Sequence, residues 1–300
     1  MKKKTYLFAL MAMALTLGSC SDNENGIGGE TSKYITVSTS IGNMTRVATD
    51  EKGGQTFEEG DEISVYAWTG DATVAPETRE RVVNNAINKL TNGSWISNPQ
   101  MLWKNNRDKH YFIGVYPISA ISDLSAGEYT FDVTKQVESD LLVAVNADGL
   151  SYNADEQQTV PLTFTHIMAK LVVNLTYKNQ WGGIPTVEKV VVGNAAKEAT
   201  INYLTKVVTP STTAKEDFSL PEITENTKYV SVIIPQEEVK QLTIVIGGKN
   251  FVYDNGTPFK LESGKITTVN LEVGRDEIKL GDVKITDWED GSTFSGEAIN

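Results

Sequence analysis

The chain has 300 residues, of which 40% are hydrophobic and one is cysteine, and its formal net charge at pH 7 is −12. This acidic composition lacks the basic patches that nucleic acids and anionic lipid surfaces require, so nucleic-acid binding and flat adsorption on a membrane are excluded. A single cysteine cannot form an internal disulfide, so stability has to come from buried apolar area.

The first predicted element is an export signal at residues 1–19. It has a basic start at Lys2-Lys3-Lys4, a short apolar run at residues 6–17, and the small residues Gly18 and Ser19. The apolar run is well short of the roughly 20 residues that a permanent membrane-spanning helix needs. Removal of this signal takes away three lysines and no acidic residue, so the formal charge of the remaining chain becomes −15.

Cys20 directly follows the two small residues, and Leu17-Gly18-Ser19-Cys20 resembles the bacterial lipobox. The resemblance implies cleavage between Ser19 and Cys20 and acylation of the Cys20 sulfur. Because several acyl chains anchor a protein stably, we expect Cys20 to tether the mature chain to the outer membrane. The alternative is an ordinary secretory signal that contains a cysteine by chance.

Residues 20–33 are polar and rich in glycine and serine, and we expect them to form a flexible tether. The acidic segment Ser21-Asp22-Asn23-Glu24 resembles a signal that directs some lipoproteins to the cell surface. A solvated linker without that role is the alternative.

From Tyr34 onward, apolar and polar residues alternate with a period of two, which predicts β-strands. In the first strand, Ile35, Val37, Thr39 and Ile41 share one face. Ile63, Val65 and Ala67 repeat the pattern after the turn at Gly60-Asp61. Further strands are predicted at residues 111–116, 129–133, 141–145, 167–177, 187–192, 229–234, 242–246, 251–253, 266–273 and 278–288.

The segment at residues 82–90 is ambiguous, because Val82, Val83, Ala86, Ile87 and Leu90 also fall on a helical stripe. Asparagines at positions 84 and 85 disfavour a helix, however, and the Asn-Gly pair at 92–93 is typical of a hairpin turn. The segment is therefore predicted to be a strand.

Many short strands with regular turns and little helix predict an all-β fold of antiparallel sandwiches. The polar stretch at residues 146–159 is the best candidate for a connection between two halves. We therefore expect an N-terminal β-sandwich domain at residues 34–158 and a C-terminal one at residues 159–300.

Residue chemistry gives no active site. His110 and His166 lie on separate predicted strands, and neither has a second ligand at metal-binding spacing, so both are expected to be structural. Nucleophile elbows, phosphate loops and dinucleotide fingerprints are absent, and no cofactor is expected. The five tryptophans are expected in the core, with stacking on sugars as the alternative.

Several stretches nevertheless resemble the fimbrillin family, the subunits of type V pili of Gram-negative bacteria. They occur in the family's order between Phe57 and Gly291. These stretches are Phe57-x-x-Gly60-Asp61-x-Ile63-x-Val65, Trp103 with Tyr111-Phe112-x-x-Val115-Tyr116-Pro117, Leu162-x-Phe164-x-His166-x-x-Ala169-Lys170-Leu171-x-Val173, Ile233-Ile234-Pro235-Gln236 and Ile285-x-Asp287-Trp288-x-x-Gly291.

The resemblance implies two transthyretin-like β-sandwich domains in tandem, a structural and adhesive role without enzyme activity, and assembly by strand exchange. In such assembly a protease cuts after an arginine downstream of the first strand, which Arg46 and Val47 would supply here. The strand carrying Ile35, Val37, Thr39 and Ile41 would then leave. A neighbour's strand would fill the groove, and Ile278, Leu280, Val283 and Ile285 are the candidate donor residues; the alternative keeps residues 278–288 as the last strand of their own domain.

The expected partners are other copies of the chain or related pilus subunits at the cell surface, together with the outer membrane through Cys20. A host-cell or glycan ligand is left open. Two alternatives remain in this family context: a pilus anchor that keeps its lipid and does not polymerise, and a surface glycan-binding lipoprotein. The glycan-binding reading predicts coplanar exposed tryptophans, whereas the pilus reading predicts buried tryptophans and a removable edge strand. A secreted hydrolase would need carboxylates clustered in a cleft.

Overall fold

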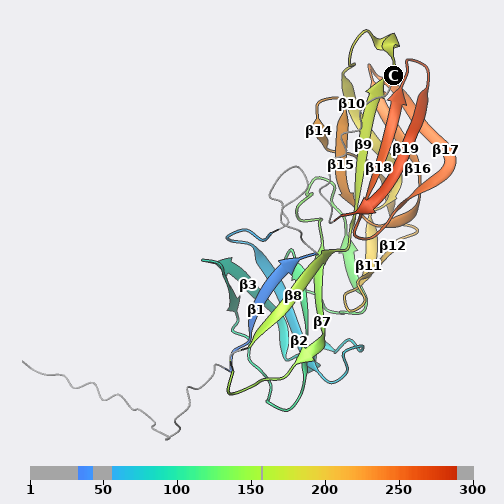
Figure 1. The fold of residues 1–300 in the computed structure, drawn as a ribbon. Coiled ribbons are helices and arrows are strands. Elements are labelled where there is room, and N and C mark those ends of the chain that lie inside the picture. The colour runs from blue at the N-terminus through green and yellow to red at the C-terminus, as the bar shows by residue number, and fades with distance from the viewer. Residues whose placement is uncertain (1–32, 43–55, 157, 289–300) are drawn as a thin grey trace, which may run out of the picture.

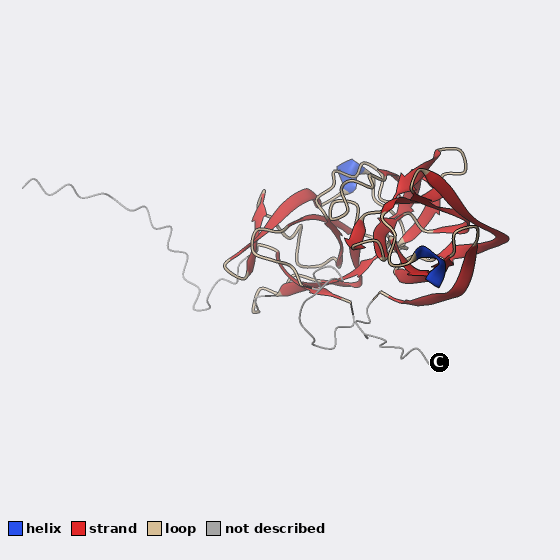
Figure 2. Ribbon diagram, turned by 90° about the horizontal axis from the view of Figure 1, so that it is seen from above, coloured by secondary structure: helices blue, strands red, loops and turns tan. Residues whose placement is uncertain are grey.

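The computed structural model describes residues 33–42, 56–156 and 158–288. Within these residues the chain forms nineteen strands and two short 3-10 helices, η1 (Thr78–Glu80) and η2 (Asn179–Trp181), so the predicted all-β class is confirmed (Figures 1 and 2). Among the described residues, no helix has the length and hydrophobicity needed to cross a membrane.

The first half of the chain forms a seven-stranded sheet. In spatial order its strands are β1 (Thr36–Ile41), β8 (Thr159–His166), β7 (Leu142–Leu150), β5 (His110–Tyr116), β2 (Glu62–Thr69), β3 (Val83–Thr91) and β4 (Ser94–Asn98).

The second half forms a five-stranded and a four-stranded sheet, and a three-stranded sheet joins the halves. The five-stranded sheet contains β14 (Glu222–Thr224), β15 (Lys228–Ile233), β9 (Ala169–Tyr177), β18 (Lys265–Val273) and β19 (Ile278–Asp287). The four-stranded sheet contains β13 (Lys215–Ser219), β10 (Val187–Ala196), β16 (Gln236–Ile246) and β17 (Lys249–Leu261). The three-stranded sheet contains β12 (Val207–Pro210), β11 (Glu198–Asn202) and β6 (Gly127–Thr130).

The sequence predicted antiparallel sheets, but two of the sheets also contain a parallel pair of strands. β1 runs parallel to β8, and β9 runs parallel to β18. Both pairs join strands that are distant in the sequence, so no tight hairpin forces their directions to be opposite. The alternation of side chains reports which residues are buried but carries no information on strand direction.

The division between the sheets also differs from the predicted boundary at residue 158. β8 begins at Thr159 but pairs with β1 and β7, so it belongs to the seven-stranded sheet. The polar stretch at residues 146–159 therefore contains the end of β7 and the connection to β8, its antiparallel neighbour in the same sheet. The sheets divide later, at Ile167 and Met168, between β8 and β9.

The ambiguous segment at residues 82–90 is a strand, as predicted. β3 and β4 form a hairpin in which Thr91 pairs with Ser94. Asn92 and Gly93 between them both have positive φ angles, 51° and 74°. A two-residue hairpin turn of this type requires positive φ at both positions, which asparagine and glycine tolerate best.

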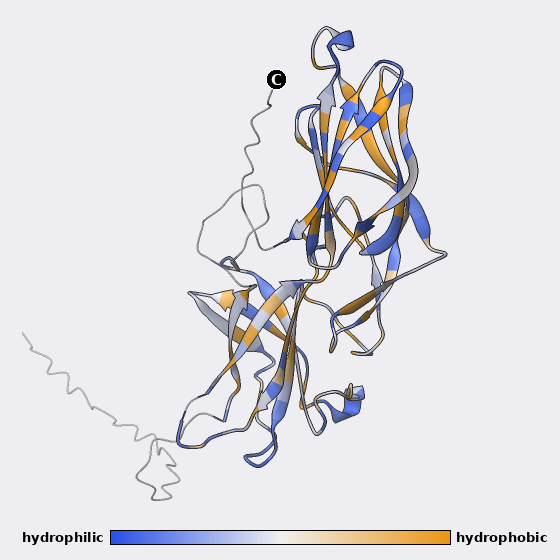
Figure 3. Cartoon of the chain, turned by 45° about the vertical axis from the view of Figure 1, so that its right-hand side comes forward, coloured by the Kyte–Doolittle hydropathy of each residue, from blue (hydrophilic) through white to orange (hydrophobic). Residues whose placement is uncertain are grey.

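Hydrophobic and hydrophilic residues alternate along the strands (Figure 3), and the buried side chains form two cores. Ile63, Val65 and Ala67 of β2 point into the inner core of the first half, as predicted. Tyr66 and Trp68 on the opposite face of the same strand are also buried, in a larger core that continues into the second half. The burial of Trp68 agrees with the expectation that the tryptophans lie in the core, but the alternation of residues did not predict that both faces of β2 are buried, because a strand covered on both faces loses the contrast on which the alternation depends.

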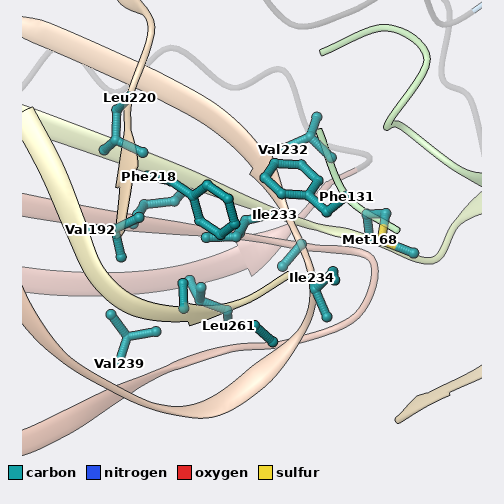
Figure 4. Close-up of a cluster of buried hydrophobic side chains, with 14 of the residues drawn as sticks. Phe131, Met168, Val192, Phe218, Leu220, Val232, Ile233, Ile234, Val239 and Leu261 are labelled. Carbon is teal, nitrogen blue, oxygen red and sulfur yellow. The ribbon is translucent and has the colours of Figure 1, made fainter. Parts of the chain in front are cut away.

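The larger core extends into the second half through the segment between β5 and β7. In this segment Phe131 packs edge-to-face on Phe218, with ring centroids 5.0 Å apart, beside Met168 and Ile233 (Figure 4). β6, from the same segment, pairs with β11. The two halves therefore share one hydrophobic core.

Buried polar groups tie this connecting segment to the seven-stranded sheet. The Tyr66 hydroxyl donates a hydrogen bond to the Ser119 carbonyl and accepts one, 2.9 Å long, from the Ile121 amide. Arg81 donates to the carbonyls of Ile121 (2.7 Å) and Ser122 (2.6 Å). These bonds satisfy backbone groups that burial would otherwise leave unpaired.

We predict that Tyr66→Phe lowers the free energy of unfolding by about 1–3 kcal/mol, because the buried Ile121 amide loses its acceptor. Urea unfolding followed by tryptophan fluorescence measures the change. Tyr111→Phe is the matched control, since the Tyr111 hydroxyl makes no hydrogen bond to the described residues. Equal midpoints for the two variants would contradict the prediction.

Candidate functional site

The predicted removable strand is the edge strand β1 of the seven-stranded sheet (Figure 1). Ile35, Val37 and Ile41 are buried, with exposed fractions of 2%, 6% and 7%, and all three belong to the inner core. Thr39, which shares their face, is half-buried. The sequence therefore predicted both the strand and its buried face.

One side of β1 is covered by β8 in a parallel ladder that runs from Thr36 opposite Thr159 to Ile41 opposite Phe164. The Gly42 amide continues this side with a hydrogen bond of 2.7 Å to the Phe164 carbonyl. β8 supplies its own row of apolar side chains to the inner core. Removal of β1 would therefore expose both an unpaired strand edge and an apolar surface.

On the opposite side of β1, the backbone hydrogen bonds are made by the residues just before the strand. The Ile35 amide donates to the Met101 carbonyl at 2.9 Å, and the Trp103 amide donates to the Lys33 carbonyl at 3.2 Å. Further along, the indole nitrogen of Trp95 donates to the Thr39 hydroxyl at 2.9 Å.

A groove of about 900 Å³ lies along β1 among the described residues, bordered by Thr36–Ile41 and by residues 93–96 of the β3–β4 hairpin. Phe57 lines it, and its ring makes edge-to-face contacts with Trp95, Tyr116 and Phe164 at 5.1–5.4 Å. The alternation in the sequence predicted none of these contacts, because it does not show which distant segments meet. An exposed strand edge beside an apolar groove is the arrangement that binds an added β-strand.

The candidate donor segment forms β19, the edge strand of the five-stranded sheet, which lies in the other half of the molecule (Figure 1). Ile278, Leu280 and Val283 are half-buried, and Ile285 is 41% exposed. In this chain β19 pairs antiparallel with β18 and is the last strand of its own half. β1 and β19 therefore belong to different sheets and do not pair with each other.

A bulge explains why these four donor residues share a face despite their uneven spacing. Leu280 pairs with Leu271 and Val283 with Val269, so two residues of β19, Gly281 and Asp282, oppose the single residue Asn270. The side-chain amide nitrogen of Asn270 donates a hydrogen bond of 2.6 Å to the Asp282 carboxylate. One extra residue restores the alternation, so both apolar pairs point the same way.

The predicted lipidation and processing residues lie outside the described residues. These are Ser19, Cys20, Arg46 and Val47. In the sequence, Arg46 follows the last residue of β1 by five positions.

Comparison with known proteins places this architecture in a family. The sequence profile described as Fimbrillin-like matches residues 45–288. The chain belongs to the fimbrillin-like family. It is 24% identical to "Putative fimbrium subunit Fim1C" of Bacteroides uniformis over 315 residues, with 97% of each chain covered. Members of the family are structural fimbrial subunits and not enzymes, so the chain is a fimbrial subunit of the cell surface.

Solved structures show the same fold. A crystal structure described as a putative cell adhesion protein from Bacteroides ovatus superposes with a TM-score of 0.61 at 18% identity, covering 85% of this chain and 98% of that one. A protein of the same description from Bacteroides uniformis gives 0.59 at 19% identity, covering 86% and 100%. A fimbrial protein from Bacteroides vulgatus gives 0.51 at 12% identity, covering 84% and 99%.

The tryptophans of this fimbrillin-like chain do not form a sugar-binding platform. Trp68, Trp103 and Trp288 are buried, and Trp95 and Trp181 are half-buried. A glycan-binding surface of the kind considered above needs coplanar exposed rings. The observed burial agrees with the feature that the pilus hypothesis predicted.

The two histidines are held by local contacts. The His110 ring is fully buried, its Nδ1 donating to the Asp108 carbonyl at 3.1 Å and its Nε2 accepting from the Lys104 amide at 3.0 Å. His166 Nδ1 lies 2.8 Å from the Asp140 carboxylate. Within residues 33–42, 56–156 and 158–288, no three histidine, cysteine or acidic side chains are arranged to hold a metal ion.

Burial lowers the pKa of the His110 imidazole from its ordinary value of 6.5. The unfolded chain therefore binds a proton more readily than the folded one, and the folded state loses stability as the pH falls below about 6.5. We predict a loss of less than about 1.4 kcal/mol per pH unit, the limit for one proton.

Urea unfolding at several values between pH about 7.5 and about 5.5 measures this dependence. His110→Gln keeps a neutral donor and acceptor, so its stability should vary less with pH across the same range. A slope identical to that of the unmodified chain would show that another group is responsible.

Proposed function

We propose that this chain is a fimbrial subunit that is exported as a lipoprotein and assembled by protease-triggered strand exchange. The observation that carries the proposal is the position of β1: an edge strand that buries three apolar side chains and is followed by an arginine five residues later. Cleavage after Arg46 would separate β1 from the rest of the chain.

Cleavage after Arg46 would make the dissociation of β1 more favourable without changing the contacts that β1 makes. Before cleavage, the connection through Gly42 keeps β1 at a high effective concentration beside β8. After cleavage β1 is a separate peptide, and its dissociation becomes essentially irreversible at low concentration. The vacated edge of β8 and the sites of Ile35, Val37 and Ile41 then need new cover, since burial of each such side chain contributes about 1.5–3 kcal/mol.

β19 of a neighbouring subunit supplies a suitable replacement. Its apolar residues Ile278, Leu280, Val283 and Ile285 lie on one face because of the bulge at Gly281. As an edge strand it has one neighbour, β18, so it can be removed without breaking the order of the other strands in its sheet. The donated strand would restore the ladder with β8 and cover the inner core.

A pilus anchor is the second candidate, and the lipobox residue Cys20 is the feature that favours it. An anchor would keep the acyl chains on Cys20 and the intact bond between Arg46 and Val47. A polymerising subunit would begin at Val47. Mass spectrometry of the N-terminus of the protein recovered from the cell surface separates the two.

We predict that Cys20→Ala abolishes acylation and surface delivery and leaves the folded domains intact, because acylation needs the thiol. Metabolic labelling with a fatty-acid analogue, followed by fractionation of the membrane, measures the effect. Ser21→Ala is the matched control and should label like the unmodified protein. Undiminished label in the Cys20→Ala protein would disprove lipidation at this site.

We also predict that an arginine-specific protease converts the soluble subunit lacking residues 1–19 into polymers and that Arg46→Ala prevents this conversion. Polymers should appear as ladders that survive mild detergent, because a donated strand restores both burial and backbone hydrogen bonds. Cross-linking and mass spectrometry should then connect β19 of one subunit with β8 of another.

Arg79→Ala is the control for this experiment. Arg79 lies in η1 with its side chain 79% exposed, so this change should affect neither folding nor assembly. If the cleaved protein releases residues up to Arg46 but stays monomeric, the proposed role as a polymerising stalk or tip subunit is wrong and the anchor function replaces it.

A further inference from the structure

β19 is attached to its own half with little side-chain burial. Along residues 278–287 every side chain is half-buried or exposed. The residue that follows, Trp288, has an exposed fraction of only 5%. The strand therefore ends in a single buried aromatic residue.

Trp288 is seated against the junction between the two halves. Its ring stacks flat on the His166 ring, with centroids 4.2 Å apart and planes inclined by 5°. The Lys170 ammonium lies 5.5 Å from the centroid of the Trp288 ring, close enough for a cation–π contact. The Trp288 amide donates to the Gly264 carbonyl at 3.1 Å.

The seat itself is built from the first half of the chain and the start of the second. His166 is the last residue of β8, and its orientation is fixed by the contact of Nδ1 with Asp140, which precedes β7. Lys170 lies near the start of β9. The residue that follows β19 thus rests on the last residue of β8, and the edge of β8 pairs with β1.

The Trp288 ring is held by stacking and burial and not by a directional bond. Its indole nitrogen is buried and has no hydrogen-bond partner among the described residues. Buried indole N–H groups usually find an acceptor, and a missing one weakens the folded arrangement. The Trp288 ring is therefore retained by its stack on His166, its contact with Lys170 and its burial.

We propose that Trp288 is a latch that keeps β19 on its own subunit. When the ring leaves its seat on His166, β19 detaches from β18, while β9, β15, β16 and the rest of β18 stay folded. β18 would still pair with β9 from Ile266 to Val273. The role of the released strand as a donor rests on the proposed function, but the latch itself does not.

Hydrogen–deuterium exchange of the uncleaved monomer tests the latch. In Trp288→Ala, amides in the peptide covering residues 279–288 should exchange about 100-fold faster or more, because an aromatic-to-alanine change removes most of the local stability. Peptides from β9, β15 and β16 should be unchanged. Ile285→Ala, on the same strand but 41% exposed, is the matched control and should exchange as the unmodified chain does.

Two outcomes would overturn the latch. Unchanged exchange at residues 279–288 would show that β18 alone retains the strand. Faster exchange throughout β9, β15 and β16 would show that Trp288 is a core residue whose loss unfolds the whole half.

Substitutions of His166 test the stacking. His166→Phe keeps a flat ring under Trp288 and should preserve the protection of β19, whereas His166→Ala should mimic Trp288→Ala. Full protection in His166→Ala would refute the role of the stack.

Assembly provides a separate readout. If Trp288→Ala frees β19 in the exchange experiment but the cleaved protein polymerises at an unchanged rate, the latch stands and β19 is not the donor strand.

Discussion

The parallel pairing of β1 with β8 is the interaction on which the rest of the structure depends. β8 carries β1 on one edge and β7 on the other, and its last residue leads through Ile167 and Met168 into β9. β1 is joined to β8 by contacts between residues 123 positions apart, and it covers one side of the inner core. Without it, β8 would be an exposed edge above an open apolar surface, which is an aggregation-prone arrangement in any sheet.

Much of the strand content could be predicted from the sequence, because a half-buried strand shows its buried face in the alternation of residues. This is why the face of β1 formed by Ile35, Val37 and Ile41 was predicted, and why asparagine and glycine chemistry identified the β3–β4 hairpin. The same signal failed for β2, where Tyr66 and Trp68 are buried on the second face by a distant segment. It also misplaced the division between the halves, since a polar stretch looks the same in a hairpin loop and in a linker.

For the candidate site, too, some features could be predicted from the sequence and others could not. Chemistry that acts on the covalent chain, such as acylation of Cys20 or cleavage after Arg46, needs only local residues and is therefore readable from the sequence. The contacts that decide how β1 and β19 are held join residues far apart: Ile35 with Met101, Phe57 with Phe164, and Trp288 with His166. Nothing in the local sequence around these residues identifies the distant partner that each one contacts.

The two edge strands also explain how assembly could proceed without a nucleotide or another energy source. In the proposed polymer a neighbour's β19 would cover the edge of β8 that β1 covers in the intact subunit, while the edge of β18 that β19 covers would open, so the contacts alone would not favour the polymer. In the proposed mechanism, cleavage would remove the effective concentration that favours β1, and mass action would then favour a strand that is still attached to a folded subunit. β1 suits this purpose because it is short, six residues with three buried side chains in and beside it, and can therefore leave once the covalent connection is cut. β19 would suit the opposite role, because the proposed latch at Trp288 would keep it paired with β18 until a neighbouring subunit presents the vacated edge of β8.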